Sequence, residues 1–194
     1  MNALEAIKAR RTTRWFSDRQ VPEKELELIV EAGTNAPHDG TFRIHVIQNA
    51  EMLECIDAAA MERMLSFDVP KLKEQFSLPG MRVLYNAPTL VLISGRTFNP
   101  MMQLNAAVAF ENMAIAATAL GVDCALIASP ASAFDPTTES GRNLAEQMLA
   151  VEQDLPKIQQ QAVMPIALLL GYRKGEDPWP WGNREDRASV THYL

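Results

Sequence analysis

The chain contains few residues that could form a disulfide bond or bind a metal ion. Its 194 residues include only two cysteines and three histidines. Cys55 and Cys124 lie in apolar stretches, far apart in the sequence and without the spacing of a metal site. No set of His, Cys, Asp and Glu has such spacing either. We therefore predict two buried free thiols, no metal centre and a reducing compartment.

Positive charge is scarce as well. The chain has 18 Lys and Arg against 24 Asp and Glu, and its formal net charge is −6. Without a basic surplus it cannot neutralise a nucleic-acid backbone, so we expect no nucleic-acid partner. Any local cluster of arginines stands out against this background and suits a small phosphorylated ligand better than a polyanion.

Long apolar runs and several familiar nucleotide or hydrolase motifs are missing. The most apolar stretch, residues 113–128, is broken by Gly121 and Asp123 and is too short to span a bilayer. The charged residues 1–11 lack the apolar region of a signal peptide, so we expect a cytoplasmic protein that does not enter a membrane. No G-x-S-x-G, Walker or G-x-G-x-x-G pattern occurs, and the hydrolase, P-loop and Rossmann interpretations have no support.

The remaining composition is that of one globular domain spanning residues 1–194. Hydrophobic residues make up 47% and charged residues 22% of the chain, and no repeat or domain boundary is visible. Asn2 and Glu5 form the sequence pattern of a capping box, which predicts a short first helix. Periodicity predicts further helices at 22–33, 51–64, 101–120 and within 135–161, and strands at 44–47, 89–94, 124–128 and 166–171. Helices interleaved with strands indicate an α+β layer fold.

Three segments have features of their own. Residues 101–120 are so rich in alanine that we expect a helix buried nearly all round, closely approached by other backbones. Residues 66–88 mix Pro, Gly, Lys and aromatics, which is typical of an irregular, lid-like excursion with one short helix at most. Residues 172–194 lack periodicity, and we expect an arm that lies over another surface.

The most informative stretch is Arg10-Arg11-Thr12-Thr13-Arg14-Trp15-Phe16, at the end of the first predicted helix. Guanidinium groups match phosphate oxygens bidentately, and threonine hydroxyls add further donors. The stretch is thus a compact anion receptor beside an apolar anchor. A solvated basic helix end, complementing the helix dipole, explains the same residues equally well when they are taken alone.

The ordered set of motifs resembles the FMN-dependent nitroreductase family. The motifs that carry the resemblance are Arg10-Arg11-Thr12-x-Arg14-x-Phe16, Ala36-Pro37, Asn86-Ala87-Pro88, Asn105-Ala106-Ala107-x-Ala109-x-Glu111-Asn112-Met113 and the strand that ends in Gly171. They cover nearly the whole chain in the right order. The short length and the loop after Ala36 are most similar to the compact branch that contains malonic semialdehyde reductase-like proteins.

The resemblance implies an interlocked homodimer with two FMN sites built from both chains and the alanine-rich helix at the interface. It also implies NADH or NADPH as reductant, and ping-pong hydride transfer through flavin N5 to a nitroaromatic, quinone or aldehyde. The FMN-binding residues that it implies are Arg10, Arg11, Thr12, Arg14, Asn35, His38, Asp39, Arg43, Ile127, Ala128 and Ser129. Arg43 would face the flavin ring, although a surface arginine is an equal alternative. No catalytic side chain is assigned, because the flavin carries the chemistry.

Some residues depart from the family pattern or have a second interpretation. The branch usually has Asp-His where this chain has His38-Asp39, and the usual Pro-Trp is absent after Arg43. This altered loop motivates an alternative function, a flavin-binding or ligand-binding protein without turnover.

Arg184 or Arg187 could add a phosphate contact from the tail, although solvent exposure is the simpler expectation. Met61, Met64, Phe67 and Phe76 are candidates for an acceptor pocket or, more simply, for the core, and His45 and His192 are expected to be structural and exposed, respectively.

Overall fold

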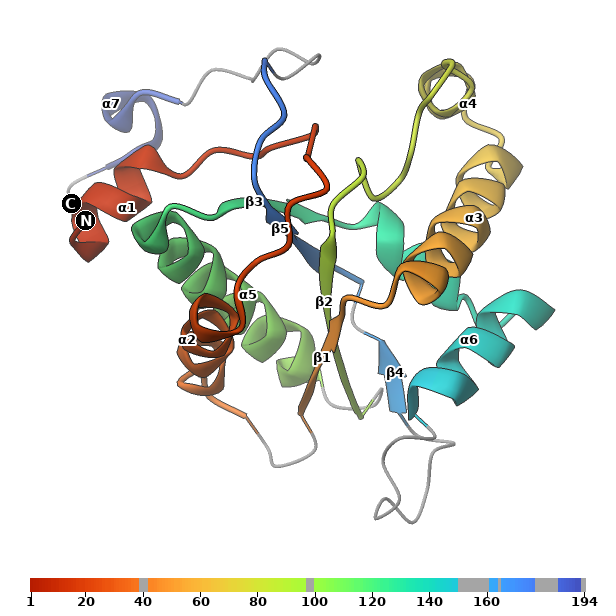
Figure 1. Cartoon of the computed structure of the whole chain (residues 1–194), viewed down its shortest axis with the longest axis horizontal. Coiled ribbons are helices and arrows are strands. Elements are labelled where there is room, and N and C mark those ends of the chain that lie inside the picture. The colour runs from red at the N-terminus through yellow and green to blue at the C-terminus, as the bar shows by residue number, and fades with distance from the viewer. Residues whose placement is uncertain (39–41, 97–99, 150–160, 164, 177–184, 193–194) are drawn as a thin grey trace.

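A computed structural model describes residues 1–38, 42–96, 100–149, 161–163, 165–176 and 185–192 (Figure 1). Its helices are α1 (Ala3–Ala9), α2 (Glu23–Thr34), α3 (Ala50–Ser66), α4 (Pro70–Phe76), α5 (Pro100–Leu120), α6 (Glu139–Leu149) and α7 (Arg187–Val190), with a 3₁₀ helix η1 at Ser129–Phe134. Its strands are β1 (Arg43–Ile47), β2 (Thr89–Arg96), β3 (Asp123–Ile127), β4 (Gln161–Val163) and β5 (Ala167–Gly171). The α+β prediction is confirmed.

The strands form one antiparallel sheet in the order β1-β2-β5-β3, with β4 paired to the far end of β2. Figure 1 shows α1, α2 and α5 on one side of this sheet and α3, α4 and α6 on the other. The side chains of β2 alternate between two cores. Leu90 and Leu92 face the α3 side, whereas Val91 and Ile93 face α5 and α2, and all four are fully buried. A continuous apolar strand covered on both faces is what residues 89–94 predict.

The first helix begins as expected. The Asn2 side chain accepts a hydrogen bond from the Glu5 backbone N–H at 3.0 Å, and the Glu5 carboxylate accepts one from the Asn2 N–H at 2.9 Å. This capping box satisfies two N–H groups that the helix itself cannot pair. The helix ends at Ala9, so Arg10 lies at its C-cap, and the chain then becomes extended.

Helix α5 corrects the expectation that its alanine-rich sequence is buried all round. One face packs fully, as at Ala106 and Met113, and Gly33 of α2 comes so close that an added Cβ would lie 2.9 Å from the Met113 side chain. The opposite face is open in the single protomer, where Leu104 is 59% and Val108 46% exposed. The small residues therefore permit close packing on one side only, and an apolar stripe is left on the other.

The prediction of two buried free thiols is confirmed for Cys124 but not for Cys55. Both thiols are free, and Cys124 on β3 is buried, but Cys55 on α3 is exposed. The buried stripe of α3 is made by Leu53, Ile56, Asp57, Ala60 and Met64. At about 100° per residue this spacing defines one face, and Cys55 falls on the other.

Residues 66–88 contain the expected short helix, α4, and then turn inward. Met81, Val83 and Leu84 are buried in the core on the α3 side. The Asp57 carboxylate holds this part of the chain, because it accepts a hydrogen bond from the Leu84 backbone N–H at 2.7 Å and pairs with Arg82 Nε at 2.7 Å. Burial raises the pKa of the Asp57 carboxyl above its usual value. Met64 and Phe76 are buried, and Met61 and Phe67 pack against the same core, so core packing is confirmed for the four acceptor-pocket candidates.

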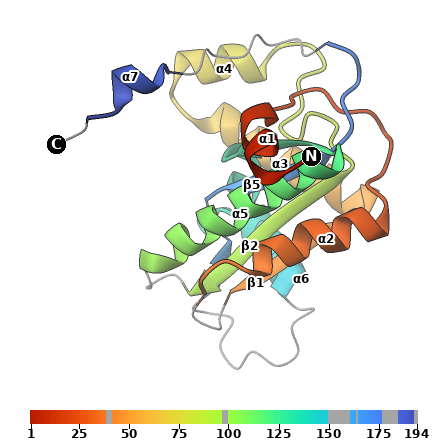
Figure 2. The same cartoon turned by 90° about the vertical axis from the view of Figure 1, so that its left-hand side faces the viewer.

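Two further boundaries differ from the predictions. The helical stretch expected within 135–161 is α6, Glu139–Leu149, preceded by a turn; Gln161 lies in β4, and residues 150–160 lie outside the described part. A three-residue strand is too short to carry a periodic signal. In the tail, residues 185–192 include α7, which Figure 2 shows apart from the two layers of the fold. No helix in the described ranges combines the length and apolarity needed to cross a membrane.

Candidate functional site

The basic segment, defined as residues 10–16, is built into the sheet by its backbone. The Thr13 N–H donates to the Cys124 carbonyl at 2.9 Å, and Thr12 pairs with Cys124 in a parallel bridge. Further along, Phe16 forms an antiparallel bridge with Arg173, just beyond β5. An extended strand places alternate side chains on opposite sides. Thr13 is fully buried, whereas Thr12 and Arg14 are half-buried on the outer side.

Phe16 anchors this segment. Its side chain is 1% exposed and belongs to the core on the α3 side, and its N–H donates to the Tyr85 carbonyl at 3.1 Å. Gly171 makes the close approach possible, because a Cβ there would lie 2.9 Å from the Phe16 ring and 2.8 Å from the Pro88 ring. The apolar anchor predicted beside the arginines is therefore present in the fold.

The first two arginines have different surroundings. Arg10 is half-buried, and its Nε lies 3.5 Å from the Glu111 carboxylate on α5. Arg11 donates from Nη1 to the carbonyls of Lys8 at 3.0 Å and Arg10 at 2.9 Å. Arg11 thus caps the end of α1, as the simpler helix-end interpretation expects. Capping and anion binding are compatible, because a guanidinium has five N–H donors.

Both arginines line a cavity of about 440 Å³ between α1, the end of α5 and the start of β3. Its lining residues are Lys8, Ala9, Arg10, Arg11, Thr118, Gly121, Val122, Asp123, Cys124 and Arg173. This group, called the basic cavity below, contains four cationic side chains and one carboxylate. Such a lining attracts an anion of the size of a phosphate group.

The three residues predicted near the flavin ring lie at the end of β3 and just beyond it. Ile127 ends β3, Ala128 is exposed, and Ser129 begins η1. With a rise of about 3.3 Å per residue, Ile127 lies roughly 10 Å from Cys124, where the basic segment joins β3. An elongated molecule held at the arginines could therefore reach residues 127–129.

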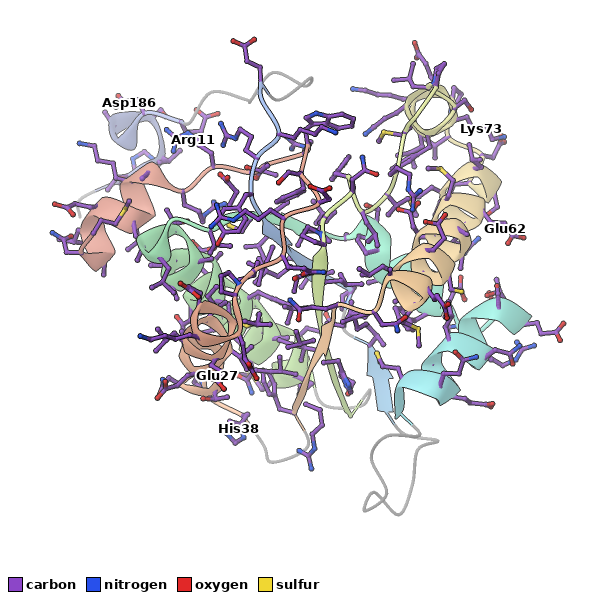
Figure 3. All side chains as sticks on the ribbon, in the orientation of Figure 1. Arg11, Glu27, His38, Glu62, Lys73 and Asp186 are labelled. Atoms are coloured by element: carbon purple, nitrogen blue, oxygen red, sulfur yellow. The ribbon has the colours of Figure 1, made fainter. Side chains whose placement is uncertain are left out.

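Of the remaining predicted residues, the described ones, Asn35, His38 and Arg43, form a second group at the opposite end of the protomer. Figure 3 places His38 beyond the end of α2, far from Arg11 beside α1. Asn35 is the C-cap of α2, and its side-chain amide donates to the Glu31 carbonyl at 3.1 Å. His38 is exposed and stacks on Phe42, with ring centroids 5.9 Å apart. Asp39 lies outside the described residues.

Arg43 opens β1 at this end, where its Nη1 donates to the Phe42 carbonyl at 2.9 Å. His45, two residues on, is structural as predicted. Its Nε2 lies 2.7 Å from the Ser94 hydroxyl of β2, and burial, reinforced by the Arg43 charge, lowers the pKa of His45 to about 4. The imidazole is therefore neutral at ordinary pH. A single protomer does not bring this second group to the basic segment.

The structure also describes the buried cysteine, the last histidine and one of the two tail arginines considered above. Burial raises the pKa of the Cys124 thiol to about 11, so this cysteine in the basic cavity is protonated and is no nucleophile. His192 is exposed, as expected. Arg187 begins α7, whereas Arg184 lies outside the described residues. The described part of the chain also has no cluster of three or more His, Cys, Asp or Glu arranged to hold a metal ion.

The sequence analysis missed Lys8 and Arg173 as neighbours of the arginines. Lys8 lies on α1. Its spacing to Arg11 is that of neighbours on a helix, a signal from which Lys8 could have been predicted to lie near the arginines. Arg173 lies two residues beyond the end of β5, and only the antiparallel pairing of β5 with β3 brings it next to Asp123. No local pattern in the sequence indicates that pairing.

The fold and the basic cavity define an α+β protein with a cationic site along one edge of an antiparallel sheet. The family profile described as the Nitroreductase family matches residues 7–172. This chain belongs to the nitroreductase family.

Solved structures with the same fold include two FMN-bound nitroreductases. The protein from Bacteroides fragilis is 25% identical, with a TM-score of 0.80 over 100% of this chain and 99% of that chain. The protein from Desulfitobacterium hafniense is 20% identical, also with a TM-score of 0.80, over all of both chains. A curated relative, the "Putative NADH dehydrogenase/NAD(P)H nitroreductase" of Methanothermobacter thermautotrophicus, is 42% identical over 59 residues. That match spans 29% of this chain and 31% of the relative.

Proposed function

We propose that this protein is an FMN-dependent NAD(P)H oxidoreductase that acts as a homodimer on electron-poor small molecules such as nitroaromatics, quinones or aldehydes. The observation that carries the proposal is the basic segment, which joins β3 beside a cationic cavity in a chain of net negative charge. Membership of the nitroreductase family and the FMN bound by the B. fragilis protein support it.

The donor set fits the cofactor. Arg10 and Arg11, with Thr12 and Arg14, would hold the FMN phosphate and ribityl chain through charged and hydroxyl donors. Residues 127–129 would pass the ring, mainly through their backbone. When bound, FMN supplies the redox centre that takes a hydride from NADH or NADPH and passes it to the second substrate in turn. The contribution of this chain is binding, orientation and exclusion of water.

The second group of predicted residues fits the proposal only across two protomers. His38 lies far from Arg11 within one chain (Figure 3), and Asn35 at the end of α2 and Arg43 at the start of β1 flank it in sequence, so the three would reach a flavin held by the partner subunit. The outer face of α5 is a suitable contact, because Met101, Leu104 and Val108 present an exposed apolar stripe. Apolar stripes of this kind mark protein–protein contacts. Asp39 belongs to the same proposed group.

The test begins with purified protein that has been saturated with FMN and then desalted. We expect about one flavin per chain to be retained, by its visible absorbance, and to be bleached by NADH or NADPH under anaerobic conditions. Each acceptor class is then added to the reduced protein, and return of the flavin absorbance is followed. A matched pair of variants checks the site: Arg14→Gln is expected to lose FMN, whereas Arg142→Gln on α6 keeps it.

The outcomes separate the alternatives. A protein that retains FMN but is not reduced by either nicotinamide supports the second function considered from the sequence, flavin or ligand binding without turnover. A protein that refuses FMN contradicts both functions.

A further inference from the structure

Arg173 reaches the basic cavity from a different part of the fold than the other cations. It lies two residues beyond the end of β5, whereas Lys8, Arg10 and Arg11 come from the end of α1. The bridge between Phe16 and Arg173 joins the two parts, and the Lys174 N–H donates to the Trp15 carbonyl at 2.9 Å. The sheet therefore brings a guanidinium from near the C-terminus to the N-terminal arginines.

The position of Arg173 is fixed at both the backbone and the side chain. Its N–H donates to Asp123 Oδ2 at 2.8 Å, while its Nη2 lies 3.2 Å from the Thr13 hydroxyl and 3.4 Å from Asp123 Oδ1. Thr13 is fully buried, so one anchor of the guanidinium belongs to the core. A side chain that is already held loses little further conformational freedom when it binds a ligand.

The described residues that line the cavity carry more positive than negative charge. Four of them are cationic and one, Asp123, is acidic, and Glu111, which pairs with Arg10, has a 44% exposed side chain. Two arginines that converge from separate elements can contact different oxygens of one phosphate, which a single helix end cannot do. A phosphate monoester, carrying close to two negative charges, suits this lining better than a carboxylate does.

We propose that Arg173 is a further phosphate-binding residue, which contacts the terminal phosphate of the flavin nucleotide from the side opposite Arg10 and Arg11. The inference rests on the proposed function and extends it to a residue outside the basic segment. Asp123 and Thr13 act as positioning residues for its guanidinium. Arg173 thereby contributes to discrimination between FMN and riboflavin, which differ only in the phosphate.

The experiment compares the affinities for FMN and riboflavin in the full-length protein by flavin fluorescence titration. The wild type is expected to bind FMN far more tightly. Arg173→Gln is expected to weaken FMN binding about tenfold while riboflavin binding changes less than about twofold, because one charged hydrogen-bonding partner is lost. Arg173→Lys, which keeps the charge but not the planar fork, is expected to fall in between. Arg142→Gln makes the same substitution on α6 and is expected to bind both flavins like the wild type.

Each binding result either supports or contradicts the role proposed for Arg173. Equal wild-type affinities for FMN and riboflavin contradict phosphate recognition, and no flavin binding at all contradicts the proposed function itself. Equal losses of FMN and riboflavin affinity in Arg173→Gln mean that Arg173 only supports the fold, and no loss of FMN affinity overturns the inference directly. If the Gln variant does not fold, Arg173→Lys carries the same comparison: an unchanged ratio of the two affinities overturns the proposal, and a reduced ratio supports it. Inorganic phosphate serves as a competitor, and it is expected to displace FMN from the wild type more readily than riboflavin.

Discussion

The basic segment and the loop after α2 are held in different ways. Residues 12–17 make backbone hydrogen bonds to β3, to the chain beyond β5 and to Tyr85, so their geometry is fixed by the sheet. Asn35 and His38 are exposed; the Asn35 amide donates to the Glu31 carbonyl and the His38 ring stacks on Phe42, both close in sequence. One protomer therefore presents a rigid cationic end and an exposed polar end. In the proposed dimer the rigid end would define where the phosphate binds, and the loop would close on it from the partner subunit.

The largest expected effect is the loss of the anchor that fixes the rigid end. Phe16→Ala removes a ring that is 1% exposed, and we expect the free energy of unfolding to fall by about 3–5 kcal/mol. Chemical denaturation followed by circular dichroism measures this change. Phe67→Ala, at a half-buried ring on the α3 side, is the matched control with a smaller expected loss. Equal losses in the two variants would show that Phe16 has no special role in holding the arginines.

The next-largest expected effect is a loss of the proposed dimer, which would bring the rigid end of one chain to the loop of the other. Val108→Glu places a carboxylate in the exposed stripe of α5, and its desolvation in an interface is expected to weaken dimerisation about a hundredfold or more. Light scattering after size-exclusion chromatography measures the mass, and the bound flavin is measured in the same peak. Gln103→Glu, at an exposed position of the same helix, adds the same charge as a control. Flavin retained by a monomeric Val108→Glu protein would contradict a site shared between two chains.

A smaller effect concerns β1, which follows the loop. The pKa of His45 is about 4 in the fold, below its ordinary value of 6.5, because burial disfavours the charged ring. Between these values the unfolded chain binds a proton that the folded chain does not. Stability should therefore fall as the pH drops from about 6.5 to about 4, by on the order of 3 kcal/mol, and this contribution should then level off.

Denaturation across that pH range tests the prediction. His45→Gln, which keeps a hydrogen-bonding group near Ser94, should flatten the curve in this window. His192→Gln, at an exposed histidine, should leave the curve unchanged. A wild-type curve that stays flat between the two pH values would mean that His45 titrates normally.

Local patterns predicted much of the fold. The capping box at Asn2 and Glu5, the apolar run of β2 and the position of α5 were all predicted correctly, because each depends on neighbours in sequence. The errors came where burial depends on packing between elements. Cys55 lies on an apolar helix but on its outer face, and Val108 lies on the exposed face of an alanine-rich helix.

For the candidate site, too, the sequence predicted neighbours in sequence but not residues that only the fold brings together. Arg10, Arg11, Thr12 and Arg14 could be proposed together because they are close in sequence. In the fold, Arg10 and Arg11 line the basic cavity and Thr12 bridges to Cys124 of β3, whereas Thr12 and Arg14 are not among the described residues that line the cavity. Arg173 could not, since it is separated from Thr13 by 160 positions and meets it only through the antiparallel pairing of β5 with β3. That His38 lies at the other end of the protomer also depends on the layer arrangement, which sequence periodicity does not specify.

The pairing of the basic segment with the chain beyond β5 also has a consequence for synthesis. The Ser17 N–H donates to the Tyr172 carbonyl and the Lys174 N–H to the Trp15 carbonyl, so the segment that carries the N-terminal arginines is held by residues that are made much later. Contacts this distant in sequence slow folding, because the intervening chain must be ordered first. A nascent chain on the ribosome thus carries an exposed cationic end until residue 174 has emerged. The proposed cofactor binding at this end, and the stability that it would add, can then begin only after residue 174 has emerged.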